Sequence, residues 1–167
     1  YRYGFDEIHG NFQENNYDNG GLGGDAVNAE AQDGMGSNCG NFATPPDGAN
    51  PRMQMCVWTF STPSRDGDLD ASIMAHEYGH GISNRMVGGP SNVSCLANAE
   101  SMLEGWADWQ ALIMTMENGD LGTDQRGLGT YVLNQPPTGG GLRPAPYTTD
   151  MTVNNYTYAN LPGVSGP

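Results

Sequence analysis

Residues 75–81 read AHEYGHG, in which two histidines stand four positions apart and a glutamate directly follows the first. Residues with this spacing project from nearly the same face of an α-helix, so His76 and His80 can point two imidazoles at one ion. Glu77 lies one step round the helix and can reach a water molecule at that ion. The HExxH spacing thus provides two zinc ligands and a base on one element. The alternative is a helix that carries two histidines by chance.

The flanking sequence predicts a helix for this motif, running from Ala71 to about Val87. Asp70 is a suitable N-cap, and the Gly-Gly-Pro run at 88–90 ends the helix. A second apolar pattern predicts a helix from about Asn98 to Glu117, closed by Asn-Gly. These two helices are the longest regular elements that the sequence indicates.

A catalytic zinc site needs a third protein ligand besides two histidines. The chain has three histidines, and the remaining one, His9, lies in an expected loop. The second helix offers EGWAD, where Glu104 stands 24 positions after His80 (104 − 80), enough for a loop and an antiparallel return. Asp108, four residues further, can accept the free N–H of a ligand histidine and so fix its tautomer and orientation.

Glu104 and Asp108 could instead be ordinary exposed acids of the second helix. Leu103, Trp106 and Trp109 make much of this helix apolar, however, and a carboxylate near an apolar face needs a partner. Two compatible i,i+4 pairs also arise by chance far less often than one. We therefore predict a His-His-Glu zinc site with Glu77 as the general base and Asp108 supporting a ligand.

Composition narrows the class of protein. A chain of 167 residues can form one domain with a core. It contains no run of about 18 apolar residues, so a membrane-spanning helix is not expected. The net charge of −13 argues against a nucleic-acid partner, because nothing would neutralise the phosphates. An acidic chain that is low in lysine suits an extracellular protein.

The cysteines and the glycosylation sequons also bear on whether the protein is extracellular. Cys39, Cys56 and Cys95 form no CxxC pair, and the sequence leaves open one disulfide with a leftover thiol or three reduced thiols. The triplets NVS and NYT make Asn92 and Asn155 candidate glycosylation sites. Together these triplets favour a eukaryotic secretory route.

The first half of the chain is expected to be β-rich. Residues 1–50 are rich in Gly and Asn and predict loops and short strands, and Met53 to Phe60 predicts one strand. Asp66, Asp68 and Asp70 alternate as in a calcium loop, but the Gly and Glu at the required offsets are missing. We interpret these acids as turn and cap residues rather than as a calcium site, and the methionines and tryptophans as core packing.

The stretches AHEYGHGISNRMVGGPSN and EGWADW resemble the fungalysin family of secreted fungal zinc metallopeptidases. Further similar stretches cover nearly the whole chain: YGFDEIHGNFQ, GGDAVNAEAQDG, NFATPPDG, STPSRDGDLD and PYTTDMTVNNYTY. The resemblance implies one zinc ion, with His76, His80 and Glu104 as ligands and Glu77 as base. The family usually reads GMGEGW where this chain has SMLEGW, a departure in the lead-in to Glu104 and not in Glu104 itself.

The resemblance also implies the architecture. The expected fold is α+β with a thermolysin-like zincin core: a β-rich N-terminal part, then the active-site helix, then the third-ligand helix. We expect residues 1–167 to be a single, partial catalytic domain from a longer chain. The family's helical lobe and its oxyanion-stabilising histidine would then follow Pro167, and a propeptide would precede the mature enzyme.

The function expected from these features is a secreted zinc endopeptidase that acts on proteins or peptides. Asn41, beside an expected edge strand, is a candidate contact for an extended substrate, with a turn asparagine as the alternative. Arg143 in GLRPAPY is similar in placement to a substrate-binding arginine of thermolysin-like enzymes, with a surface salt bridge as the alternative. Two other functions remain: a non-catalytic secreted protein that kept the zinc scaffold, and an aminopeptidase, which lacks a visible site for a substrate amino terminus.

Overall fold

The structure, a computed structural model, describes residues 4–98, 102–157 and 160. Within these residues the fold is mixed α+β, with two α-helices and two small sheets, which agrees with the expected fold class. The elements in chain order are η1 (Glu7–His9), β1 (Asn28–Glu30), β2 (Gly40–Ala43), β3 (Arg52–Met55), β4 (Val57–Trp58), β5 (Arg65–Asp66), η2 (Gly67–Leu69), α1 (Ala71–Gly88) and α2 (Leu103–Met114). No described helix combines the length and the apolar content that crossing a membrane requires.

The larger sheet has the strand order β1-β3-β2. Strand β1 runs parallel to β3, whereas β2 runs antiparallel to it, with Asn41 opposite Gln54. Strand β2 is therefore an edge strand of this sheet. Strands β4 and β5 form a separate antiparallel pair.

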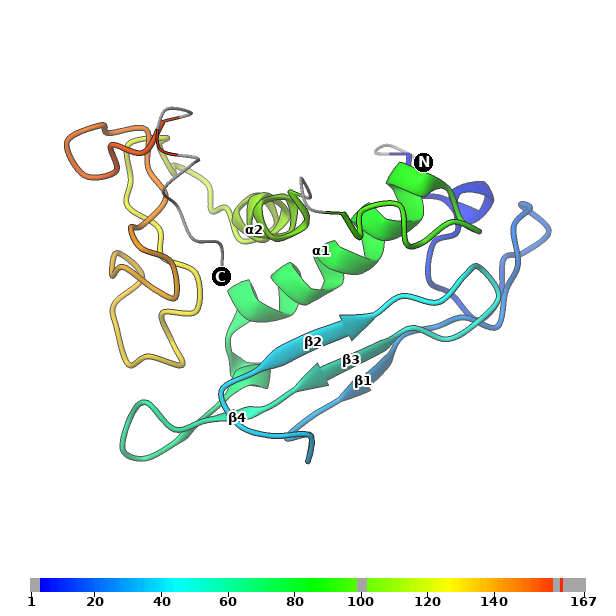
Figure 1. Ribbon diagram of the computed structural model, residues 1–167, viewed down its shortest axis with the longest axis horizontal. Coiled ribbons are helices and arrows are strands. Elements are labelled where there is room, and N and C mark those ends of the chain that lie inside the picture. Colours follow the sequence, from blue (N-terminus) through cyan, green and yellow to red (C-terminus); the bar gives the residue numbers. More distant parts are fainter. Residues whose placement is uncertain (1–3, 99–101, 158–159, 161–167) are drawn as a thin grey trace.

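Helix α1 lies between the three-stranded sheet and α2 (Figure 1). Beneath it, Met55, Trp58, Ile73 and Val132 form a buried apolar cluster, and Ala75, Ala111 and Leu128 form a second cluster between the helices. The two helices approach closely at Gly79, where an added Cβ would lie 3.1 Å from the Cα of Ala107. Because Gly79 has no side chain, α2 can approach α1 closely here. The face of α2 that carries Glu104 and Asp108 then lies against the face of α1 that carries the histidines.

The prediction for α1 is confirmed. The helix begins at Ala71, and the Asp70 side chain accepts hydrogen bonds from the N–H groups of Ser72 and Ile73 as an N-cap. It ends at Gly88, one residue beyond the predicted end, and Gly89 follows with a positive φ of 84°.

The prediction for the second helix is too long at both ends. Helix α2 begins at Leu103, and Met102 provides no side-chain cap. It ends at Met114, where the Thr115 hydroxyl donates to the carbonyl oxygen of Ala111 and a turn follows. The expected start at Asn98 is therefore wrong, and residues 99–101 lie outside the described part of the chain.

The single strand predicted for Met53 to Phe60 is also wrong. Cys56 separates β3 from β4 and forms a disulfide with Cys39, so the chain leaves one sheet and joins the other at this residue. The Cys56 N–H still donates to the carbonyl oxygen of Cys39, 3.1 Å away. The pairing settles the open cysteine question, because Cys95 is left as an exposed free thiol.

Candidate metal centre

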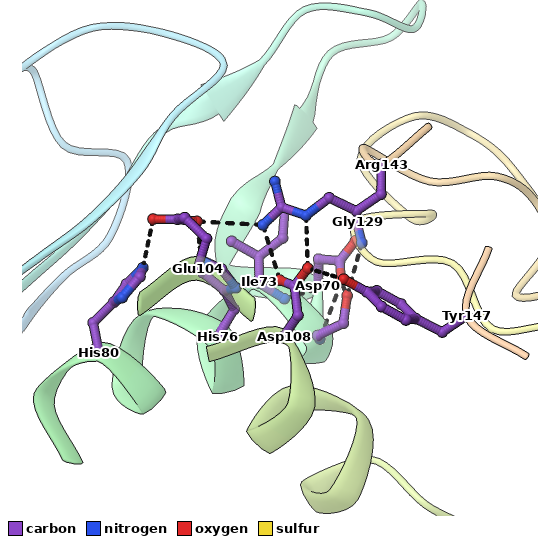
Figure 2. A network of polar contacts seen from close by, with 10 residues as sticks. Asp70, Ile73, His76, His80, Glu104, Asp108, Gly129, Arg143 and Tyr147 are labelled. Carbon is purple, nitrogen blue, oxygen red and sulfur yellow. Dashed lines mark hydrogen bonds and ion pairs between the residues drawn. The ribbon is translucent and has the colours of Figure 1, made fainter. Parts of the chain in front are cut away.

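Three side chains from the two helices converge on one point (Figure 2). His76 and His80 come from successive turns of α1, and Glu104 comes from the first turn of α2. The Nε2 atom of His76 lies 3.1 Å from Glu104 Oε2, and the Nε2 atom of His80 lies 3.3 Å from Glu104 Oε1. The structure thus brings together the three residues predicted as ligands.

The spacing of these atoms fits a zinc ion. A tetrahedral zinc with bonds of about 2.0–2.1 Å holds its ligand atoms roughly 3.3 Å apart. The candidate ligand atoms all lie within 4.8 Å of one another, and no other described His, Cys, Asp and Glu residues form such a group. Two imidazoles and one carboxylate are also a donor set that catalytic zinc sites use.

Asp108 supports this cluster from behind. Its Oδ1 atom lies 2.6 Å from His76 Nδ1, on the side of the imidazole that faces away from Glu104. Arg143 donates to both carboxylate oxygens of Asp108, from Nε at 2.7 Å and from Nη2 at 2.9 Å, and the Tyr147 hydroxyl donates to Oδ2. The structure therefore places Asp108 against His76, one of the two histidines predicted as ligands.

A family model described as fungalysin metallopeptidase (M36) matches residues 1–166. The chain belongs to this family. Membership of a metallopeptidase family implies a bound metal ion, and His76, His80 and Glu104 form the one group among the described residues that could hold it. The resemblance inferred from the sequence motifs is confirmed.

Curated relatives agree with this assignment. Extracellular metalloproteinase 2 of Trichophyton tonsurans is 48% identical over 167 residues, which cover 99% of this chain and 26% of that protein. Extracellular metalloproteinase 2 of Arthroderma gypseum is 49% identical over the same length, with the same coverage. Extracellular metalloproteinase MEP of Pyricularia oryzae is 48% identical over 161 residues, or 95% of this chain and 25% of that protein. The chain spans about a quarter of the length of these relatives.

The charges of this fungalysin site are set by burial and by neighbouring groups. Burial opposes a charge on His76, but hydrogen bonds to Asp108 and Glu104 outweigh it and raise the pKa of His76 to about 9. Burial and the nearby His76 lower the pKa of His80 to about 4. Burial of Asp108 is outweighed by its hydrogen bonds to His76, Arg143 and Tyr147, which hold the pKa of this carboxyl well below its usual range. The supporting carboxylate is therefore ionised.

Glu77 is a buried acid beside the three candidate ligands. The residue is 7% exposed, and burial raises the pKa of Glu77 to about 7, against the attraction of His76. A carboxyl group that exchanges its proton near neutral pH is suited to general acid–base chemistry. Glu77 also lines an open groove of about 280 Å³. The groove is bounded by Gly40, Asn41, Phe42, His76, His80, Asn84, Leu103 and Glu104.

Both substrate-contact candidates lie at this site. Asn41 is exposed on the edge strand β2, lines the groove, and donates from its side-chain amide to Gln54 Oε1 at 3.2 Å. Arg143 forms the ion pair with Asp108 and also lies 3.3 Å from Glu104 Oε2 through Nη2. The sequence left open a substrate contact or a salt bridge for Arg143. The structure shows a salt bridge, and it lies within the candidate site and not on a remote surface.

The other predicted residues lie elsewhere. The glycosylation candidates Asn92 and Asn155 are both exposed. Asp70 serves as the cap of α1, as predicted, and Asp66 caps η2. The expectation that tryptophans pack in the core holds for Trp58 but is wrong for two residues of α2: Trp106 and Trp109 are 40% and 62% exposed. The same expectation for the methionines holds for the buried Met55 but is wrong for six exposed ones: Met35, Met86, Met102, Met114, Met116 and Met151.

Sequence reasoning missed Tyr147. It belongs to an irregular segment, so no helix or strand periodicity relates it to α2, and its contact with Asp108 spans 39 positions. The only sequence signal was its place four residues after Arg143 in GLRPAPY. In the structure this segment passes along the outer face of the site, so that both side chains contact Asp108.

Proposed function

We propose that this chain carries the catalytic centre of a secreted zinc endopeptidase with a thermolysin-like arrangement of its helices. The observation that supports this most strongly is the convergence of His76, His80 and Glu104 from two helices, with Glu77 buried beside them at an open groove. Family membership and the names of the relatives, which are extracellular metalloproteinases, support the same function.

Each of the three candidate ligands offers one atom to an ion. His76 and His80 would bind it through Nε2, and Glu104 would bind it through a carboxylate oxygen. Zinc, when bound, supplies a Lewis acid that polarises the scissile carbonyl and makes a water molecule more acidic. Asp108 holds His76 in the tautomer that leaves Nε2 free for the metal, because its carboxylate accepts a hydrogen bond from Nδ1–H and so keeps the proton on that nitrogen.

Glu77 is the proposed proton carrier. It accepts a proton from the attacking water and passes it to the amine that leaves when the peptide bond breaks. The edge strand β2 lies along the groove, so an extended substrate can pair with its backbone while Asn41 contacts the peptide. Arg143 contacts a substrate carbonyl from the other side of Glu104. The histidine expected beyond Pro167 for oxyanion stabilisation stays a prediction, as do the propeptide and glycans at Asn92 and Asn155.

Casein hydrolysis by the full-length secreted protein tests this function. Activity should be lost with a zinc chelator and return when zinc is added. Glu77→Gln should retain bound zinc and lose roughly 100-fold or more of the rate, because the amide cannot carry the proton. Zinc bound without any cleavage of casein or peptides would favour a non-catalytic zinc protein, and a fully active Glu77→Gln variant would show that another group is the base.

A further inference from the structure

At Gly40 the edge strand leaves no room for a side chain beside the proposed base, Glu77. This glycine is the first residue of β2, and an added Cβ would lie 3.0 Å from Cδ and 3.1 Å from Cγ of Glu77, and closer still to Oε1. The absence of a side chain at position 40 therefore leaves the space that the outer half of Glu77 occupies.

This packing contact matters because little else orients the Glu77 carboxylate. Within the described part of the chain, no hydrogen bond joins that carboxylate to a protein donor, while Asp108 and Glu104 both have such partners. Glu77 must nevertheless hold its oxygen atoms at one place in the groove, because proton transfer requires hydrogen-bond distance to the reacting water. The backbone surface at Gly40, which limits where the Glu77 carboxylate can lie, thus contributes to the geometry of the site.

The backbone at Gly40 is held firmly on its other sides. It pairs with Met55 in the antiparallel register of β2 and β3. The preceding residue, Cys39, is linked by a disulfide to Cys56, which is fully buried. If a side chain were added at position 40, the free end of Glu77 would therefore move before the strand did.

We propose that Gly40 is a positioning residue, whose bare Cα sets the distance between the edge strand and the Glu77 carboxylate. The inference rests on the proposed peptidase function and assigns one more residue to that site. The φ angle of Gly40 lies outside the left-handed region, so alanine is compatible with its backbone. The substitution Gly40→Ala thus tests the space and not the conformational freedom of glycine.

Gly40→Ala in the full-length protein should lower kcat by about 10- to 100-fold, the scale expected when a reacting group shifts by about an ångström. KM and the zinc content per molecule should stay at their wild-type values, because Glu77 is not a metal ligand. The matched control is Gly34→Ala, since an added Cβ at Gly34 has no atom within 4 Å. This control should keep its kcat within about twofold of wild type.

A double variant separates a displaced carboxylate from general damage. Glu77→Asp withdraws the carboxylate by one methylene and frees the space opposite Gly40. Adding Gly40→Ala to Glu77→Asp should then lower kcat by less than about threefold, because the two changes act on one contact and are not additive. Equal losses in both backgrounds would overturn the proposal, as would a wild-type kcat for Gly40→Ala or a loss of zinc from that variant.

A readout without substrate keeps this inference distinct from the proposed function. Crystal structures of zinc-loaded wild type and Gly40→Ala should differ in the position of the Glu77 carboxylate by about 1 Å or more, with the β2 backbone superposing. A carboxylate that stays in place while β2 moves away would overturn the proposal even in an active enzyme. An inactive wild-type protein with the carboxylate displaced in the variant would overturn the peptidase function and leave the positioning role supported.

Discussion

Asp108 is the residue on which the geometry of the centre most depends. It is 1% exposed, and a buried carboxylate is costly unless its charge is paired and its oxygens are hydrogen-bonded. Three donors satisfy it: the imidazole of His76, the guanidinium of Arg143 and the hydroxyl of Tyr147. The same contacts orient His76 toward the proposed metal position. The stability of this buried charge and the placement of a candidate ligand therefore depend on the same hydrogen bonds.

Replacing Asp108 with asparagine should weaken zinc binding. The amide keeps the size of the side chain but presents an NH2 group to at least one of the donors, and it no longer offsets the charge of Arg143. Loss of such a supporting partner typically reduces metal affinity about 10- to 100-fold. Competition with a fluorescent zinc chelator measures the change.

Asp18→Asn is the control for this substitution, because it makes the same chemical change at an exposed acid. Its zinc affinity should equal that of the wild type. An Asp108→Asn protein that binds zinc as tightly as the Asp18→Asn protein would show that the Asp108 carboxylate does not support the ligand.

At the level of elements, the start of α1 is fixed by one side chain that also binds a distant segment. The Oδ1 atom of Asp70 caps the helix through Ser72 and Ile73. Its Oδ2 atom accepts from the backbone N–H groups of Tyr131 and Val132, at 3.1 and 3.3 Å. The cap therefore links helix α1 to the loop region that leads on to Arg143.

Asp70→Ala should destabilise the protein by about 2–4 kcal/mol in the free energy of unfolding. Loss of the cap costs about 0.5–2 kcal/mol, and buried N–H groups left without an acceptor add about 1–3 kcal/mol. Urea unfolding followed by tryptophan fluorescence measures this change. Asp66→Ala, which removes the cap of the three-residue η2, should cost about 1 kcal/mol or less, and equal costs for the two variants would contradict the double role of Asp70.

The elements also show what the sequence could and could not reveal. Helical periodicity, an N-cap and the i,i+4 spacing of His76 and His80 are local features, so α1 and its ligand face were predictable. Glu104 and Asp108 followed from the same rule on a second helix. The split of the predicted strand depended on the disulfide at Cys56, and the approach of Tyr147 to Asp108 depended on the path of an irregular segment. The strand break and the Tyr147 contact both depend on tertiary structure, which a local sequence pattern cannot predict.

On the scale of the whole molecule, Arg85 organises the glycine- and asparagine-rich N-terminal region around α1. Its side chain is fully buried near the C-terminal end of the helix. It pairs with Asp25 at 3.1 Å and Asp47 at 3.3 Å, and it donates to the carbonyl oxygens of Gly10 and Pro45. One guanidinium thus orders several loop segments that have little regular structure of their own, and two of its partners, Pro45 and Asp47, lie just after the edge strand β2.

Arg85→Met should therefore destabilise the protein more than any exposed ion-pair variant. Methionine fills most of the space, but it leaves Asp25, which is fully buried, without its charge partner. Removing one member of a buried pair costs about 3–5 kcal/mol, which urea unfolding of the full-length protein would measure.

The control is Arg52→Met, because Arg52 is half exposed and its pair with Glu30, at 2.7 Å, lies on the surface. That variant should cost about 1 kcal/mol or less. Similar costs for the two variants would mean that the N-terminal loops are held by their own packing and not by the buried guanidinium.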